Sequence, residues 1–81
     1  MPNKLRVLSN KDIVKILAVF SFNFYSQRGS HIKLRRTING HHQVLTVPAH
    51  KELTKGTIKA IYEQASNYIP EEELDKHFYT K

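Results

Sequence analysis

A chain of 81 residues can bury one hydrophobic core, so we expect a single domain over residues 1–81 and no second one. The absence of cysteine excludes a disulfide framework and a thiolate zinc site. The apolar runs are short and interrupted by polar residues, which predicts a soluble, cytoplasmic protein with no membrane-spanning segment.

The positive charge is concentrated in one part of the chain. There are 13 Lys and Arg against 7 Asp and Glu, a formal net charge of +6, and residues 28–59 alone account for a net +6. A localised basic band is expected in a protein that binds a polyanion through phosphate contacts. The alternative is an ordinary solvated surface.

The chain begins with signals for a helix and then for strands. Ser9 and Asp12 form a capping-box pattern, and apolar residues follow at helical spacing: Ile13, Ile16, Leu17 and Phe20. From Phe22 the apolar period changes to two, which predicts strands around Phe24, around Ile32 and Leu34, and from Val44 to Pro48. We assign the phenylalanines of this region to the core, namely Phe20, Phe22 and Phe24.

The turn signals predict the register of these strands. A two-residue turn at Asn39-Gly40 places four apolar residues on one face: Ile32, Leu34, Leu45 and Val47. For the first hairpin we favour a three-residue loop, Arg28-Gly29-Ser30, because it pairs Phe24 with Leu34. That loop also sets Gln27 opposite His31.

Two more helices are expected near the C-terminus. Thr54 is a suitable cap for a helix with apolar residues at Ile58, Ile61, Tyr62 and Ala65, and Asn67 is a candidate stop. Pro70 in a first turn, followed by acidic residues 71–73, predicts a short last helix that includes Leu74 and Phe78. The order is therefore α-β-β-β-α plus a short C-terminal helix, an α+β fold with helices on one face of a three-stranded antiparallel sheet.

The uncovered face of this sheet is expected to be polar and basic. On the predicted register it carries Tyr25, Gln27, His31, Lys33, Arg35, Thr37 and Thr46. Pro48 is opposite His31, so His50 and Lys51 are expected near the same end. Tyr25 is the aromatic residue that this register exposes to a nucleic acid.

One histidine among cations suits metal-independent RNA cleavage. A base removes the proton of a 2′-hydroxyl, the oxygen attacks the adjacent phosphorus, and an acid protonates the leaving 5′-oxygen. His31 is our candidate base and His50 a candidate acid or supporting residue, and Lys33, Arg35 or Lys51 could stabilise the phosphoryl charge. We expect no cofactor and no metal, since adjacent His41 and His42 point to opposite faces of a strand.

Three ordered sequence blocks lie along the chain: Gln27-Arg28-Gly29-Ser30-His31, Val47-Pro48-Ala49-His50, and Lys55-Gly56-Thr57-Ile58-Lys59-Ala60-Ile61 followed by Gln64-Ala65. In this order and at these spacings they resemble the HicA (YcfA-like) family of mRNA interferase toxins. The resemblance spans about Ser9 to Phe78. One departure is Ser21, at a point between first helix and first strand where family members often have glycine.

The resemblance implies a fold like the double-stranded-RNA-binding domain and ribosome-independent mRNA cleavage with His31 as the catalytic residue. It also implies a HicB-type antitoxin that covers the active face, and Gly29 and Ser30 as residues that shape the loop before His31. We expect contacts to mRNA from Gln27, Arg28, Ser30, Lys33, Arg35 and Lys51, and no DNA binding by the protein alone. The acidic C-terminal tail, Glu71 to Lys81, could cover part of the basic face or contact the partner. The second hypothesis is a non-catalytic RNA-binding module of the same fold. The third hypothesis is a protein whose basic face binds an acidic protein partner.

Overall fold

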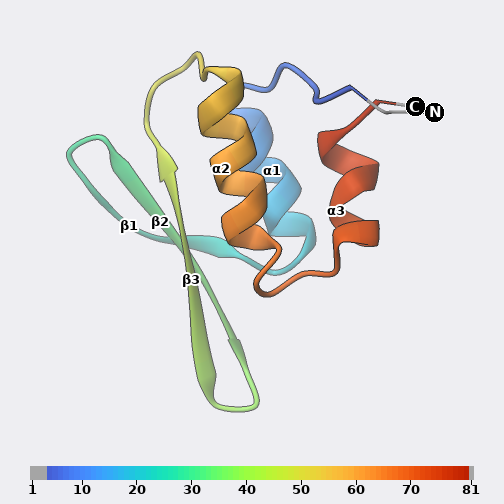
Figure 1. Cartoon of the computed structure of the whole chain (residues 1–81). Coiled ribbons are helices and arrows are strands. Elements are labelled where there is room, and N and C mark those ends of the chain that lie inside the picture. Colours follow the sequence, from blue (N-terminus) through green and yellow to red (C-terminus); the bar gives the residue numbers. More distant parts are fainter. Residues whose placement is uncertain (1–3, 81) are drawn as a thin grey trace.

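The computed structural model describes residues 4–80 and has six elements. In chain order they are α1 (Asn10–Val19), β1 (Asn23–Arg28), β2 (His31–Ile38), β3 (His41–Pro48), α2 (Lys55–Ala65) and α3 (Glu71–Phe78). The strands form one antiparallel sheet in the order β1-β2-β3. Helices α1 and α2 lie on one side of the sheet, and α3 lies beyond them (Figure 1). The predicted α+β fold, similar to the double-stranded-RNA-binding domain, is confirmed.

Helix α1 begins and ends with specific hydrogen bonds. The Ser9 side chain accepts from the Asp12 amide at 3.1 Å, and the Asp12 carboxylate accepts from the Ser9 amide at 3.0 Å, so the predicted capping box is present. At the other end, Ser21 has φ of 71°, and the Phe22 amide donates to the Leu17 carbonyl at 3.0 Å. This is a Schellman motif, with Ser21 at the position where glycine is usual.

The later helices follow the sequence signals with small differences. The Thr54 side chain accepts from the Thr57 amide at 3.2 Å, as expected of a cap. Helix α2 ends at Ala65, two residues before Asn67. Pro70 precedes the first turn of α3 as its N-cap residue.

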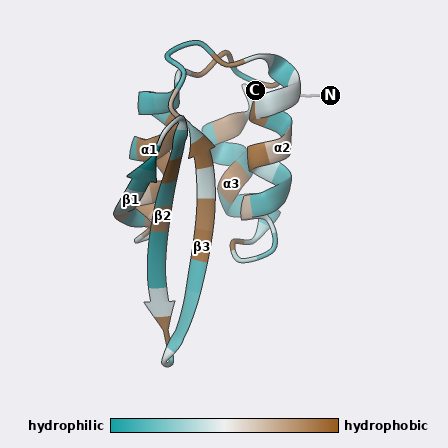
Figure 2. Cartoon of the chain, turned by 90° about the vertical axis from the view of Figure 1, so that its left-hand side faces the viewer, coloured by the Kyte–Doolittle hydropathy of each residue, from teal (hydrophilic) through white to brown (hydrophobic). Residues whose placement is uncertain are grey.

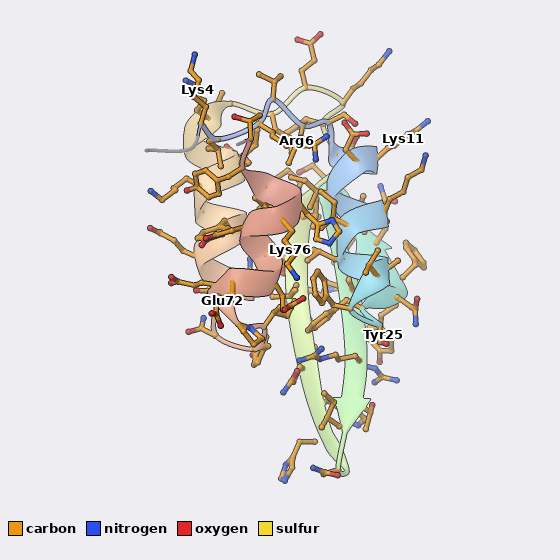
Figure 3. The ribbon with its side chains drawn as sticks, turned by 90° about the vertical axis from the view of Figure 1, so that its right-hand side faces the viewer. Lys4, Arg6, Lys11, Tyr25, Glu72 and Lys76 are labelled. Atoms are coloured by element: carbon orange, nitrogen blue, oxygen red, sulfur yellow. The ribbon has the colours of Figure 1, made fainter. Side chains whose placement is uncertain are left out.

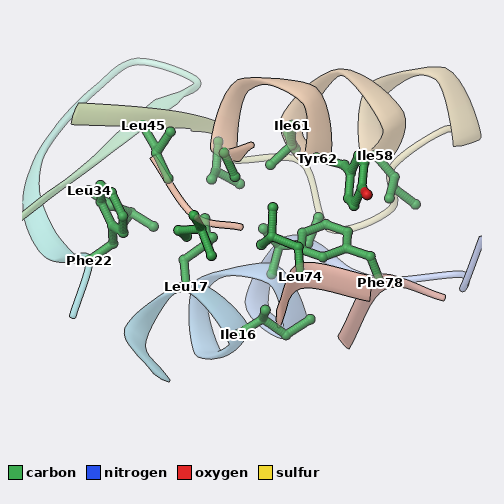
Figure 4. Packing of buried hydrophobic residues seen from close by; sticks show 14 of the residues in the cluster. Ile16, Leu17, Phe22, Leu34, Leu45, Ile58, Ile61, Tyr62, Leu74 and Phe78 are labelled. Carbon is green, nitrogen blue, oxygen red and sulfur yellow. The ribbon is translucent and has the colours of Figure 1, made fainter. Parts of the chain in front are cut away.

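The core lies between the helices and the covered face of the sheet (Figure 4). Each large apolar side chain buried there contributes roughly 1.5–3 kcal/mol of stability. Phe22 is fully buried, and Phe20 is half-buried with its ring 5.5 Å from that of His77. Phe24 is 63 % exposed, so its assignment to the core was wrong. The Tyr62 hydroxyl donates to Asp75 at 2.5 Å, and burial and this bond raise the pKa of Tyr62.

The second hairpin has the predicted register. Ile32 pairs with Val47, Leu34 with Leu45, and His31 with Pro48. The two turn residues Asn39 and Gly40 both have positive φ, 51° and 79°, which is the requirement of a type I′ turn. The far end of this hairpin, residues 37–42, is exposed and extends past the helices (Figure 1).

The first hairpin differs from the prediction. Its loop contains only Gly29 and Ser30, so Arg28 pairs with His31 and Gln27 pairs with Ile32. A bulge at Tyr25 then restores the pairing of Phe24 with Leu34.

Two polar side chains join the sheet to the helices. The Gln64 amide accepts from the Thr46 backbone N–H at 3.0 Å and donates to its carbonyl at 3.3 Å, so it covers part of the open edge of β3. The Arg36 guanidinium donates to the carbonyls of Phe20 and Tyr68 at 3.0 and 2.9 Å, and to the Gln43 side chain at 2.6 Å. Burial lowers the pKa of Arg36.

The acidic C-terminal helix does not cover the basic face. Leu74 and Phe78 of α3 are buried in the core, on the helical side of the molecule. Figure 3 looks from that side, and Glu72 and Lys76 point outward from α3 with the sheet behind. In the part of the chain described, no helix has the length and apolar character needed to cross a membrane.

Candidate functional site

The face of the sheet turned away from α1 and α2, called the free face below, is arranged in rows of cross-strand neighbours. The rows are Arg28–His31–Pro48, then Ser26–Lys33–Thr46, then Asn23–Arg35–Val44. Figure 2 looks onto this side of the sheet, and hydrophilic residues prevail along β1 and β2. The alternation of side chains along β2 therefore brings His31, Lys33 and Arg35 to one surface.

His31 is exposed at the end of β2, beside the Gly29-Ser30 loop. Arg28 lies opposite it on β1 and Pro48 on β3. The Ala49 amide donates to the Ser30 carbonyl at 2.8 Å, which holds the chain leaving β3 against the loop that precedes His31. His50 is the next residue after Ala49 and is also exposed. The structure thus brings the first two sequence blocks together around His31.

The cations of this face have no carboxylate among the strands. None of the residues in β1, β2 or β3 is acidic. Within residues 4–80 the one salt bridge joins Lys76 to Glu73, inside α3. Because opposite charges are not built into the sheet, its positive potential remains available to an external anion.

Tyr25 extends this surface toward the beginning of β1. It is 53 % exposed, and the Arg35 guanidinium carbon lies 4.0 Å from the centre of its ring. That distance is within the range of a cation–π contact. The predicted exposure of Tyr25 is confirmed.

Two predicted contact residues lie elsewhere. Gln27 pairs with Ile32 and therefore lies on the covered side, where its amide donates to the Gly29 carbonyl at 3.2 Å. The wrong loop length caused this misplacement. Lys51 lies beside the start of α1, where its carbonyl accepts from the Asn10 amide at 3.4 Å, and not on the strands of the free face.

The remaining histidines do not gather into a ligand cluster. His42 lies beside Thr37, with 2.9 Å between its Nδ1 and the Thr37 Oγ1. His41 pairs with Ile38 at the hairpin turn, on the adjacent and opposite-facing position. Residues 4–80 contain no group of three His, Cys, Asp or Glu side chains that could hold a metal ion.

Sequence reasoning missed the position of Arg28 beside His31. The sequence signal was Gly29, because glycine readily adopts the positive φ that a two-residue hairpin loop requires. In the structure, Gly29 has a φ of 59°. It also missed the structural use of Arg36, which takes one cation of the basic band away from the free face.

The fold and this face define a small α+β protein with a basic, histidine-bearing sheet surface. A family model described as the HicA toxin of bacterial toxin-antitoxin matches residues 11–66. The chain belongs to the HicA toxin family, and it is a toxin of a toxin-antitoxin system. Family membership also implies a partner antitoxin. No curated protein matches the chain, and no solved structure does.

Proposed function

We propose that this toxin is an endoribonuclease that cuts mRNA without a metal ion, with His31 as general base. The observation that carries the proposal is the exposed imidazole of His31 on an acid-free basic face, between Arg28 on one strand and Pro48 on the other. Membership of the HicA family supports the same conclusion.

The proposed reaction needs one base, one acid and positive charge. His31 removes the proton of a 2′-hydroxyl, and the 2′-oxygen attacks the adjacent phosphorus. The bond from phosphorus to the 5′-oxygen breaks, and that oxygen takes a proton from the acid, for which His50 is the candidate. The products are a 2′,3′-cyclic phosphate and a 5′-hydroxyl. Arg28 and Lys33 bind and stabilise the phosphoryl oxygens as their charge grows, and Arg35, farther along β2, contributes to binding of the RNA.

The HicB-type antitoxin is proposed to neutralise the toxin by covering this face. The absence of acidic residues from the three strands supports a partner that supplies the negative charge. Such a partner competes directly with RNA for the cations around His31.

Cleavage of RNA in EDTA by wild type and by His31→Ala tests the mechanism. Loss of the base should slow cleavage by about 10²- to 10⁴-fold. A substrate with 2′-O-methyl groups should remain intact, because it has no proton for His31 to remove. His41→Ala is the matched control, since His41 is an exposed histidine at the hairpin turn.

Three results would contradict the proposal. Equal cleavage by wild type and His31→Ala would remove His31 from the reaction. Salt-sensitive RNA binding by wild type with no products at all would favour the non-catalytic RNA-binding module. Binding to an acidic antitoxin with no RNA affinity would favour a partner-binding protein.

A further inference from the structure

A hollow of about 360 Å³ lies beside the Tyr25–Arg35 pair, at the end of β1 opposite the Gly29-Ser30 loop. Its lining residues come from the start of β1 and from the middle of β2: Ser21, Asn23, Phe24, Tyr25, Arg35, Arg36 and Thr37. The volume is within the roughly 300–1,000 Å³ range of small-ligand sites in proteins. The mechanism proposed for His31 does not use this hollow.

The bulge in β1 explains why an aromatic ring stands at this hollow. Ser26 pairs with Lys33 and Phe24 with Leu34, so Tyr25 between them has no partner on β2. Bulges re-aim a side chain in this way. The Tyr25 ring lies against the Arg35 guanidinium, and Figure 3 shows Tyr25 at the outer edge of the molecule. The guanidinium carbon lies 4.0 Å from the ring centre and Tyr25 is 53 % exposed, so two planar groups stand together and part of the pair is accessible to solvent.

A polar side chain lies beside this flat pair. Asn23 donates one N–H to the Ser21 carbonyl at 3.4 Å, which leaves its Oδ1 and a second N–H for another group. A flat cationic and aromatic surface with an amide at its edge matches an unstacked nucleobase, which offers a π face and hydrogen-bonding edges.

We propose that the hollow at Tyr25 and Arg35 binds one nucleobase of the RNA, by stacking, a few nucleotides away from the bond that is cut at His31. The inference rests on the proposed function for the identity of the ligand as RNA. Arg35 lies four residues from His31 along β2, which at about 3.3 Å per residue separates the two positions by roughly 13 Å. A bound single strand thus follows β2 and has a phosphate at His31 and a base at Tyr25.

The test measures RNA affinity in the His31→Ala chain, where cleavage is expected to be too slow to interfere with binding. A set of short single-stranded RNAs is used, each with one abasic nucleotide at a different position. We expect one position at which the missing base weakens binding by about 5- to 100-fold, the range that stacking on one aromatic ring supports. In Tyr25→Ala that position should lose its special sensitivity.

Companion variants separate stacking from other effects. Tyr25→Phe retains the ring and should retain the sensitive position, and Tyr25→Leu retains apolar bulk without a ring and should lose it. His41→Ala, an exposed ring elsewhere on the hairpin, should leave the profile unchanged. An unchanged profile in Tyr25→Ala and Tyr25→Leu, a profile with no sensitive position, or no RNA binding would overturn the proposal.

The outcome is distinct from that of the cleavage test. Coupling between Tyr25 and one base, with wild type leaving RNA uncut, would support the base site and contradict the nuclease. Cleavage that depends on His31, with no coupling to Tyr25, would support the nuclease and overturn the base site.

Discussion

Arg28 lies directly opposite His31 across the antiparallel pair of β1 and β2. Directly opposed residues on one face have Cβ atoms about 4.5–5.5 Å apart, close enough for both side chains to contact one phosphate group. The guanidinium provides a rigid fork of donors that fits phosphate oxygens. His31 therefore has a cation beside it on the neighbouring strand, in addition to Lys33 two residues along its own strand.

This pairing predicts a strong effect of Arg28 on catalysis. If its guanidinium stabilises the charge that develops on the phosphoryl oxygens, Arg28→Ala should lower the cleavage rate at saturating RNA by about 10²- to 10³-fold. Arg28→Lys retains the positive charge but loses the forked donors of the guanidinium, so its cleavage rate should lie between those of wild type and Arg28→Ala. Gln27→Ala is the control, because Gln27 is adjacent in sequence but faces the covered side. A slow Gln27→Ala together with a fast Arg28→Ala would contradict this assignment.

The sequence predicted those parts of the fold whose signals are local. The Ser9–Asp12 capping box and the Asn39-Gly40 turn each depend on residues within a few positions of one another. The first hairpin was mispredicted because its register depends on a bulge at Tyr25. Tyrosine is an ordinary strand residue, and no glycine or positive φ marks this position as a bulge. The predicted pairing of Phe24 with Leu34 is nevertheless confirmed, since it fits the alternation of side chains along β2.

In the candidate site, too, the residues whose placement depends on local signals were predicted correctly, and those that depend on distant contacts were not. His31, Lys33 and Arg35 belong to one strand, so period two alone places them on one face. Gln27 required the correct loop length, and it was placed on the wrong face. Arg36 was counted with the basic band because its carbonyl partners are 16 and 32 residues distant in sequence, at Phe20 and Tyr68.

Arg36 and Arg35 are neighbours in sequence with opposite roles, and this predicts different effects on stability. Arg36→Ala leaves the carbonyls of Phe20 and Tyr68 without their donor, and we expect a loss of about 2–4 kcal/mol in the free energy of unfolding. Arg35→Ala removes a side chain on the free face and should cost less than about 1 kcal/mol. Urea denaturation of the two variants measures both values.

Arg36→Lys sharpens the same comparison. One ammonium group cannot reproduce the separate bonds that the guanidinium makes to two backbone carbonyls and to Gln43, so most of the loss should remain. Full stability in Arg36→Lys would contradict a structural role of the guanidinium hydrogen bonds. Equal losses of stability in Arg35→Ala and Arg36→Ala would contradict it as well.

Asp12 predicts a dependence of stability on pH. Hydrogen bonds from Ser9, chiefly from its backbone N–H, lower the pKa of Asp12 below its ordinary value of 3.8. The folded state therefore favours the charged carboxylate, and this contribution is present above roughly pH 4 and is lost as the pH falls through the lowered pKa. Asp12→Asn should be less stable than wild type at neutral pH, and the difference should shrink in acid.

Ser9→Ala is the matched variant for Asp12. It removes the hydroxyl that accepts from the Asp12 amide and should cost about 1 kcal/mol, with a weaker dependence on pH than the Asp12→Asn difference. Thermal unfolding followed from neutral pH into acid provides the comparison. A difference between wild type and Asp12→Asn that stays constant across this range would contradict the role of the charged carboxylate.

Ser21 predicts a stabilising substitution at the end of α1. Its φ of 71° is left-handed, which costs an L-residue about 1–2 kcal/mol, whereas glycine adopts it freely. Because glycine loses about 0.5–1 kcal/mol more backbone entropy on folding, Ser21→Gly should raise the free energy of unfolding by about 0.5–1 kcal/mol. Ser26→Gly is the control, since Ser26 lies in β1 without positive φ and should be destabilised. Destabilisation of both variants in urea would show that the Schellman turn imposes no strain on Ser21.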